Sequence, residues 1–256
     1  MNMLGIFDSG LGGLTVVRAL EQKFPDIGYV YYGDTARLPY GTKTPQTIGR
    51  YTVAALEYLR RHGAATPVIA CHTASSTLAA HPDIREQALA AAGSEMLFDV
   101  VTPAVEAARA STREGRIGIL GTTATVRSGI YETLLHDAEV TQVPASVLVG
   151  LAEEGWTDTR HAGPILEDLL LPFQRARVDT VVLACTHFPL LAEAIRDILG
   201  PEVQLIDPGE ALADALLQEE IRPEAGSRRY FATDVPNDFS ERAGRFLGRN
   251  IEVEQA

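Results

Sequence analysis

Short runs of Val, Ile, Leu and Ala recur along this chain, and stretches with helical periodicity separate them. Strands with hardly any polar side chain are buried on both faces, which is typical of parallel sheets that helices cover on both sides. Regular alternation of strand and helix supports the same architecture, so the sequence predicts an α/β fold. The predicted strands are 3–7, 29–33, 67–71, 116–120, 179–185, 203–207 and 228–234, and the main predicted helices are 15–24, 44–63, 103–112, 164–177, 189–199, 209–221 and 238–248. Residues 147–155 show no clear preference for helix or strand.

The same pattern occurs twice. "LGIFDSGLGG" (4–13) and "IGILGTTATV" (117–126) are both glycine-containing turns after a strand, and each precedes a strand that ends in Ala-Cys. The only two cysteines, Cys71 and Cys185, end those strands. Ligands of open α/β sheets bind beyond the carboxyl ends of strands. We therefore expect two similar α/β units with both thiols facing one cleft between them.

Charge and composition exclude several classes of protein. The net charge of −12 over 256 residues argues against binding to nucleic acid or to an anionic membrane surface. No apolar run reaches the roughly 18 residues of a spanning helix, and the N-terminus lacks the pattern of a secretory signal. These features predict a cytoplasmic protein, whose thiols stay reduced. Lys23 and Lys43 are the only lysines, and neither position suits the Schiff base of pyridoxal phosphate chemistry.

Four interpretations of the cysteines are open. A buried cysteine is often a small core residue, although here both thiols lie where a strand ends and a helix begins, with His72 and His187 close by in sequence. A zinc site is disfavoured, because C-x2-C spacing is absent and adjacent residues at a strand end point apart. A single nucleophilic cysteine leaves the second one unexplained. Two matched thiols suit racemisation, in which one removes a proton from carbon and the other delivers a proton to the opposite face.

Polar loops supply the other candidates. Asp8 and Ser9 precede a predicted helix, where either could be a helix cap or could hold an ammonium group or a thiol. The loops at 39–41 and 122–125 offer hydroxyl and backbone N–H groups to a carboxylate. Glu153 and Glu154 are more typical of a solvated face than of a catalytic pair.

Eight motifs together resemble those of the cofactor-independent aspartate/glutamate racemases, and of glutamate racemases in particular. They are "GIFDSGLGGLTV", "GDTARLPYGTKT", "ACHTAS", "GILGTTATVRSGIY", "LAEEG", "VVLACTHFPLL", "LIDPGEALA" and "YFATD". The order and spacing match nearly from end to end. The resemblance implies two pseudosymmetric α/β domains with the active site at their interface, the first formed by residues 1–98 with 208–256 and the second by residues 99–207.

The resemblance also implies the chemistry. Cys71 would act on D-glutamate and Cys185 on L-glutamate, with Asp8 assisting Cys71, and His187 and Glu153 assisting Cys185. No metal or other cofactor is implied. The residues expected to hold the substrate are Ser9, Pro39, Tyr40, Gly41, His72, Thr73, Thr122, Thr125 and Thr186. The implied role is the supply of D-glutamate for peptidoglycan, by a homodimer.

Three positions depart from the family's pattern. His72 stands where the family usually has Asn, Gly150 replaces a Pro, and Pro208 replaces a Ser. An imidazole offers a different hydrogen-bond geometry from an amide, so His72 bears on substrate choice. The alternatives are therefore a racemase for aspartate or a broader set of amino acids, a glutamate-binding homologue without activity, and a one-cysteine hydrolase or decarboxylase.

Overall fold

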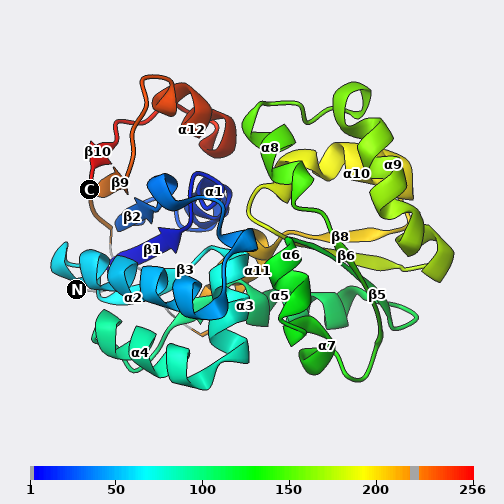
Figure 1. Cartoon of the computed structure of the whole chain (residues 1–256), viewed down its shortest axis with the longest axis horizontal. Coiled ribbons are helices and arrows are strands. Elements are labelled where there is room, and N and C mark those ends of the chain that lie inside the picture. The colour runs from blue at the N-terminus through cyan, green and yellow to red at the C-terminus, as the bar shows by residue number, and fades with distance from the viewer. Residues whose placement is uncertain (1–2, 220–224) are drawn as a thin grey trace.

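The structure, a computed structural model, describes residues 3–219 and 225–256 and contains two α/β units that lie side by side (Figure 1). Each unit has a sheet in which every strand pairing is parallel, as the sequence predicts. Within the described residues, no helix is both long and apolar enough to cross a membrane.

The two sheets repeat one strand order. The first sheet has the order β10-β9-β2-β1-β3-β4 and the second has β6-β5-β7-β8. Strands β2-β1-β3-β4 thus correspond to β6-β5-β7-β8, and both cysteines follow the third strand of this series. Two strands from the C-terminal segment, β9 and β10, extend the first sheet beyond β2. The strands are β1 (Leu4–Asp8), β2 (Tyr29–Gly33), β3 (Thr66–Ile69), β4 (Phe98–Asp99), β5 (Arg116–Gly121), β6 (Glu139–Pro144), β7 (Thr180–Ala184), β8 (Gln204–Ile206), β9 (Arg228–Ala232) and β10 (Glu254–Gln255).

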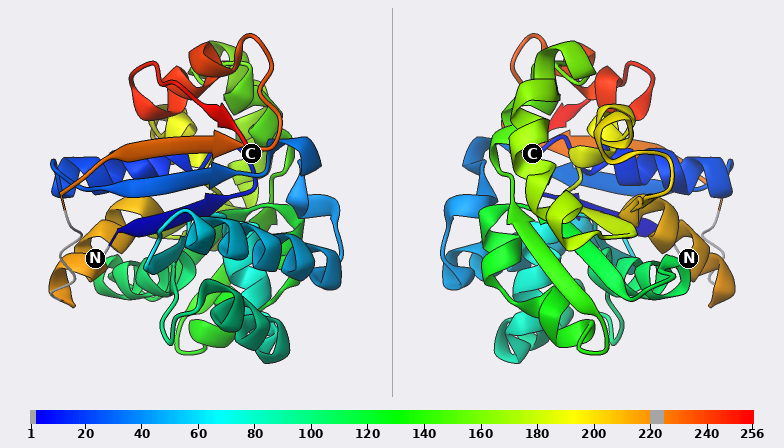
Figure 2. Two further views of the ribbon diagram at one scale, coloured as in Figure 1. Left: turned by 90° about the vertical axis from the view of Figure 1, so that its left-hand side faces the viewer. Right: turned by 90° about the vertical axis from the view of Figure 1, so that its right-hand side faces the viewer.

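Helices cover both faces of each sheet (Figure 2). One face of the first sheet packs against α1 (Leu14–Lys23), α11 (Pro208–Gln218) and α12 (Phe239–Leu247), and the other against α2 (Pro45–Arg61), α3 (His72–Ala80) and α4 (Pro82–Ala92). The second sheet lies between α8 (Val147–Glu153), α9 (Thr159–Ala176) and α10 (Ala192–Leu199) on one face and α5 (Val101–Ser111) and α7 (Ile130–Leu134) on the other. The remaining helices are α6 (Thr123–Arg127), η1 (Thr35–Arg37), η2 (Tyr40–Thr42) and η3 (Phe188–Leu191).

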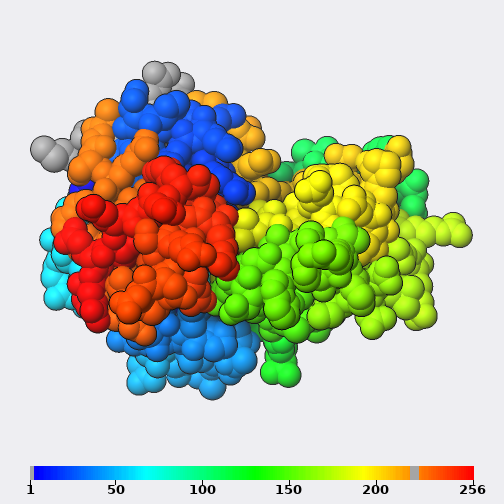
Figure 3. All heavy atoms as spheres, turned by 90° about the horizontal axis from the view of Figure 1, so that it is seen from above, coloured from blue at the N-terminus to red at the C-terminus, as the bar shows by residue number. Residues whose placement is uncertain are grey.

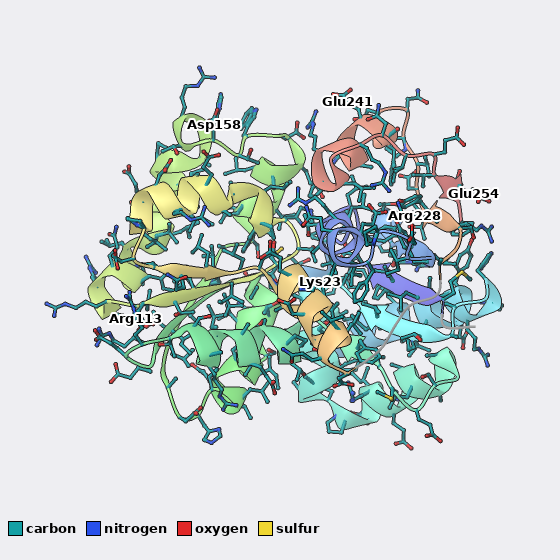
Figure 4. All side chains as sticks on the ribbon, turned by 180° about the vertical axis from the view of Figure 1, so that it is seen from behind. Lys23, Arg113, Asp158, Arg228, Glu241 and Glu254 are labelled. Carbon is teal, nitrogen blue, oxygen red and sulfur yellow. The ribbon has the colours of Figure 1, made fainter. Side chains whose placement is uncertain are left out.

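Side-chain alternation along the strands builds these layers. In β1, Leu4 and Ile6 pack in the core beneath α1 and α11, whereas Phe7 packs beneath α2 and α3. Because both faces are buried, the strands carry apolar residues at nearly every position. Charged side chains such as Arg113, Asp158, Glu241 and Glu254 lie around the rim of the molecule (Figure 4).

Some elements differ from the sequence prediction. Strand β6 was not predicted, and the ambiguous segment 147–155 forms α8. Helix α9 begins before Pro164, because the Asp158 side chain accepts a hydrogen bond from the His161 N–H and caps it. The predicted helix over 209–221 is α11, and its last two residues lie outside the described part of the chain.

Candidate active site

Cys71 lies where the carboxyl end of β3 meets the N-terminus of α3, as predicted. The side chain is buried, and its S–H donates to Ser9 Oγ over 3.3 Å. Burial, and after it the nearby Asp8 carboxylate, raise the pKa of Cys71 to about 12. The Ser9 hydroxyl and the backbone N–H of Ala74 favour the thiolate but do not outweigh burial. Cys71 is therefore a protonated thiol at neutral pH.

Asp8, the last residue of β1, lies between the two units. Its carboxylate is fully buried and accepts hydrogen bonds from the Gly10 N–H over 2.9 Å and from the Thr186 hydroxyl over 3.4 Å. Burial raises the pKa of Asp8, although the positive charge of His187 opposes that rise. Asp8 therefore connects the Cys71 half of the site to the Cys185 half.

Cys185 follows β7 and is also buried. His187 Nδ1 lies 3.8 Å from Cys185 Sγ, and Nε2 on the other side of the ring lies 3.1 Å from Glu153 Oε1. Burial alone would lower the pKa of His187, but the hydrogen bonds to Cys185 and Glu153 raise it to about 10. His187 is then an imidazolium, which stabilises negative charge that develops on the Cys185 sulfur.

Gly12 allows the two units to meet closely at this point. A Cβ on Gly12 would lie 2.3 Å from Thr186 Oγ1 and 2.4 Å from His187 Nδ1. These distances are too short for any non-glycine residue unless the neighbouring side chains shift. The Thr15 hydroxyl also donates to the Thr186 carbonyl over 2.8 Å, from one unit to the other. Figure 3 shows the C-terminal segment and the second unit in contact along the interface between the two units, which we call the seam.

The predicted substrate loops meet across the same seam. Thr122 Oγ1 lies 3.0 Å from Thr73 Oγ1 and 3.0 Å from Thr125 Oγ1, so three hydroxyls from α3 and α6 form one chain. A Cβ on Gly41 would lie 3.2 Å from the Thr122 side chain. Tyr40 follows Pro39 and is buried, and its hydroxyl donates to Asp34 Oδ2 over 2.6 Å. The loops at 39–41 and 122–125 therefore lie against each other.

His72 is buried beside Cys71, and neither ring nitrogen has a hydrogen-bond partner among the described residues. Burial lowers the pKa of His72 to about 3, so the ring is neutral. A buried imidazole without partners is costly, because its two nitrogens lose water and gain nothing. His72 and Thr73, one member of the three-hydroxyl chain, are the first two residues of α3.

Sequence reasoning missed two residues that support the site. Asp34 is fully buried and holds Tyr40, with Thr233 donating to its second oxygen over 3.0 Å. Its position in the "GDTAR" motif could have identified it as a site residue. Arg242 reaches Glu153 from a helix 89 residues further along the chain, and no sequence pattern pointed to it.

Glu153 and Glu154 differ in their contacts. Glu153 contacts His187, whereas the Glu154 side chain makes no contact of that kind in the described part of the chain. Among residues 3–219 and 225–256, no three His, Cys, Asp or Glu side chains come together as a metal site.

The sequence pattern of the Asp/Glu/hydantoin racemase family matches residues 13–216. The chain belongs to this family. Glutamate racemase of Geobacter metallireducens is 39% identical over 97% of this chain and 93% of its own length.

Solved structures of family members have the same fold. Glutamate racemase from Francisella tularensis, in complex with D-glutamate, superimposes with a TM-score of 0.87 over 100% of this chain and 97% of that one, at 28% identity. A glutamate racemase from Bacillus anthracis gives a TM-score of 0.89 over the same shares of the two chains, at 30% identity.

Proposed function

We propose that this chain is a glutamate racemase that interconverts L- and D-glutamate by proton transfer at Cα between two thiols. One observation carries the proposal. Two buried cysteines follow equivalent strands, β3 and β7, of two sheets with the same strand order, and both halves converge on Asp8. A single-cysteine mechanism would not need the second thiol or its separate His187–Glu153 support.

The proposed reaction moves one proton off carbon and another onto it. The Cys185 thiolate takes the α-proton of L-glutamate and becomes a thiol, and the electron pair remains on the substrate as a carbanion next to the α-carboxylate. The Cys71 thiol then delivers its proton to the opposite face and becomes a thiolate, which gives D-glutamate. The reverse reaction exchanges the two roles. Buried donors that are already in place stabilise the carbanion.

The supporting residues divide between the two thiols. We assign Asp8 to Cys71, and His187 with Glu153 to Cys185. Their distances support these roles, because His187 contacts both Cys185 and Glu153. The substrate would be held by Ser9, Pro39, Tyr40, Gly41, His72, Thr73, Thr122, Thr125 and Thr186.

An adjoining cavity favours an anionic substrate. It has a volume of about 540 Å³ and adjoins the contact between Gly41 and the 122–125 loop. Lys43, His81 and Arg127 line it, and no carboxylate among the described residues does. In a chain with a net charge of −12, a cavity lined by Lys43 and Arg127 without a carboxylate among the described residues attracts a dicarboxylate to the seam. Separation of the two units there would admit the substrate.

The test is turnover of L- and D-glutamate in deuterated water by the wild type and by the C71S and C185S variants. Circular dichroism follows racemisation, and NMR follows loss of the Cα proton. We expect the wild type to place solvent deuterium at Cα of the product and both variants to lose racemisation. Retention of racemisation by either variant would refute the two-thiol mechanism, and binding of glutamate without exchange would refute the activity. L-aspartate in a parallel run tests the nearest rival substrate.

The wider role is part of the same proposal. The product D-glutamate would supply peptidoglycan synthesis in the cytoplasm. We propose a homodimer and a division into domains at residues 98/99 and 207/208. The first of these boundaries falls within β4. Analytical ultracentrifugation tests the dimer, and limited proteolysis tests the division.

A further inference from the structure

Helix α12 packs with the first sheet but contacts the catalytic support of the second unit. Figure 1 shows it facing α8 across the top of the molecule. Arg242 Nη2 lies 2.9 Å from Glu153 Oε2, and Arg245 Nη1 donates to the Glu153 carbonyl over 2.9 Å. Phe246 packs edge-on against the His187 ring, with the ring centroids 5.2 Å apart. One helix of one unit therefore contacts both groups that serve Cys185.

The position of Glu153 explains why it needs a cation. Glu153 is the last residue of α8, where the helix dipole disfavours a carboxylate and where the final carbonyl groups lack helical partners. Arg245 satisfies one of those carbonyls, and Arg242 pairs with the side chain. The Glu153 side chain is only 17% exposed, so this ion pair is screened less than a surface pair.

Each oxygen of Glu153 has its own cationic partner. Oε1 contacts His187 and Oε2 contacts Arg242, so the carboxylate is fixed in one orientation. Hydrogen bonding to His187, and further the charge of Arg242, lower the pKa of Glu153. The proton between Glu153 and His187 therefore stays on Nε2 of the imidazole, and the ring keeps its positive charge while Nδ1 on its other side faces Cys185.

We infer that Arg242 is a positioning residue for the Cys185 half of the reaction, holding Glu153 against His187. This inference rests on the proposed glutamate racemase function. Arg242 does not reach the reacting atoms and acts through Glu153. Cys71 has no corresponding arginine relay in the described residues, because Asp8 and Ser9 support it directly.

Kinetic isotope effects can show whether loss of Arg242 slows the proton transfer at Cys185 or the one at Cys71. For a racemase the equilibrium constant is one, so a variant changes kcat/KM equally in both directions. Deuterium at Cα of L-glutamate, however, is transferred only in the Cys185 step, and deuterium at Cα of D-glutamate only in the Cys71 step. R242Q should lower kcat/KM at least about tenfold, because a hydrogen bond between charged groups is lost. It should also enlarge the isotope effect with 2-deuterated L-glutamate and reduce the effect with 2-deuterated D-glutamate.

Two control variants separate positioning from loss of structure. R245Q removes the contact of the same helix with the Glu153 main chain, and we expect it to keep the wild-type ratio of the two isotope effects. R242K keeps a cation and should fall between the wild type and R242Q. In an E153Q background, adding R242Q should not change the ratio of the two isotope effects any further, because Arg242 acts through the Glu153 carboxylate.

Three results would overturn the inference. They are an unchanged isotope-effect ratio in R242Q, equal changes in R242Q and R245Q, and a full additional change in the E153Q background. Failure of the wild type to racemise glutamate would instead refute the proposed function.

Discussion

Replacement of His72 by Asn should make the protein more resistant to acid. Burial lowers the pKa of His72 to about 3 from 6.5, so between these values the unfolded chain binds a proton that the folded chain excludes. Stability from this group is fully present above pH 6.5 and is lost as the pH falls towards 3. Each pH unit in this window corresponds to about 1.36 kcal/mol. From pH 7.5 to pH 4.5 the wild type should therefore lose about 2.7 kcal/mol that H72N keeps.

Urea unfolding at pH 7.5, 6.0 and 4.5, followed by circular dichroism, measures this difference. Carboxyl groups such as Asp8 and Asp99, whose pKa values burial raises, titrate in both proteins and cancel in the comparison. His187 has a pKa raised to about 10, so its contribution to stability is lost as the pH rises above 6.5, and because both proteins keep His187 this change also cancels. H81N, at a half-exposed position after α3, is the matched control for an imidazole-to-amide change. Parallel stability curves for the wild type and H72N would refute the reasoning, because they would mean that His72 is protonated in the folded state or lies in contact with water.

Two further predictions concern the seam. G12A adds a methyl group within 2.3 Å of Thr186 Oγ1, and displacement of the site by about 1 Å should lower kcat/KM about 100-fold, which a racemisation assay would detect. Activity within threefold of the wild type would contradict the closed geometry. Y40F deprives the buried Asp34 of a 2.6 Å hydrogen bond and should cost about 1–3 kcal/mol in unfolding free energy, together with a higher KM for glutamate. Unchanged urea unfolding in Y40F would show that Asp34 does not depend on that hydroxyl.

The core of the fold was predictable because its strands are buried on both faces. β1 and β7 are entirely buried and read as continuous apolar runs. β6 was missed because it is an edge strand in which Glu139 and Pro144 are exposed, so its apolar signal is weak. The true start of α9 was missed because Pro164 resembles a first-turn proline, whereas the Asp158 cap lies further upstream.

The candidate site was predictable where chemistry coincides with the ends of strands. Asp8 ends β1, and Cys71 and Cys185 follow β3 and β7, and ligands of open parallel sheets bind beyond the carboxyl ends of such strands. Arg242 could not be found in this way. Its proposed role depends on α12 lying against a helix whose Glu153 is 89 residues away in sequence, and helix periodicity does not reveal which unit a half-buried arginine contacts.

The fold makes the two cysteines equivalent in position, each directly beyond the third strand of the repeated series, but their neighbours differ. Burial leaves Cys71 with a raised pKa of about 12, whereas Cys185 lies 3.8 Å from an imidazole whose own pKa is raised to about 10. For L-glutamate the proposed mechanism starts from a Cys71 thiol, as found here, and an imidazolium beside Cys185 stabilises negative charge that develops on that sulfur. For D-glutamate the proposed mechanism starts instead from a Cys71 thiolate, and a substrate ammonium group bound near Asp8, as proposed, would favour that thiolate. In the proposed mechanism the repeated strand order thus supplies the two bases, and the different neighbours, Asp8 beside Cys71 and His187 beside Cys185, would set which of them begins the reaction.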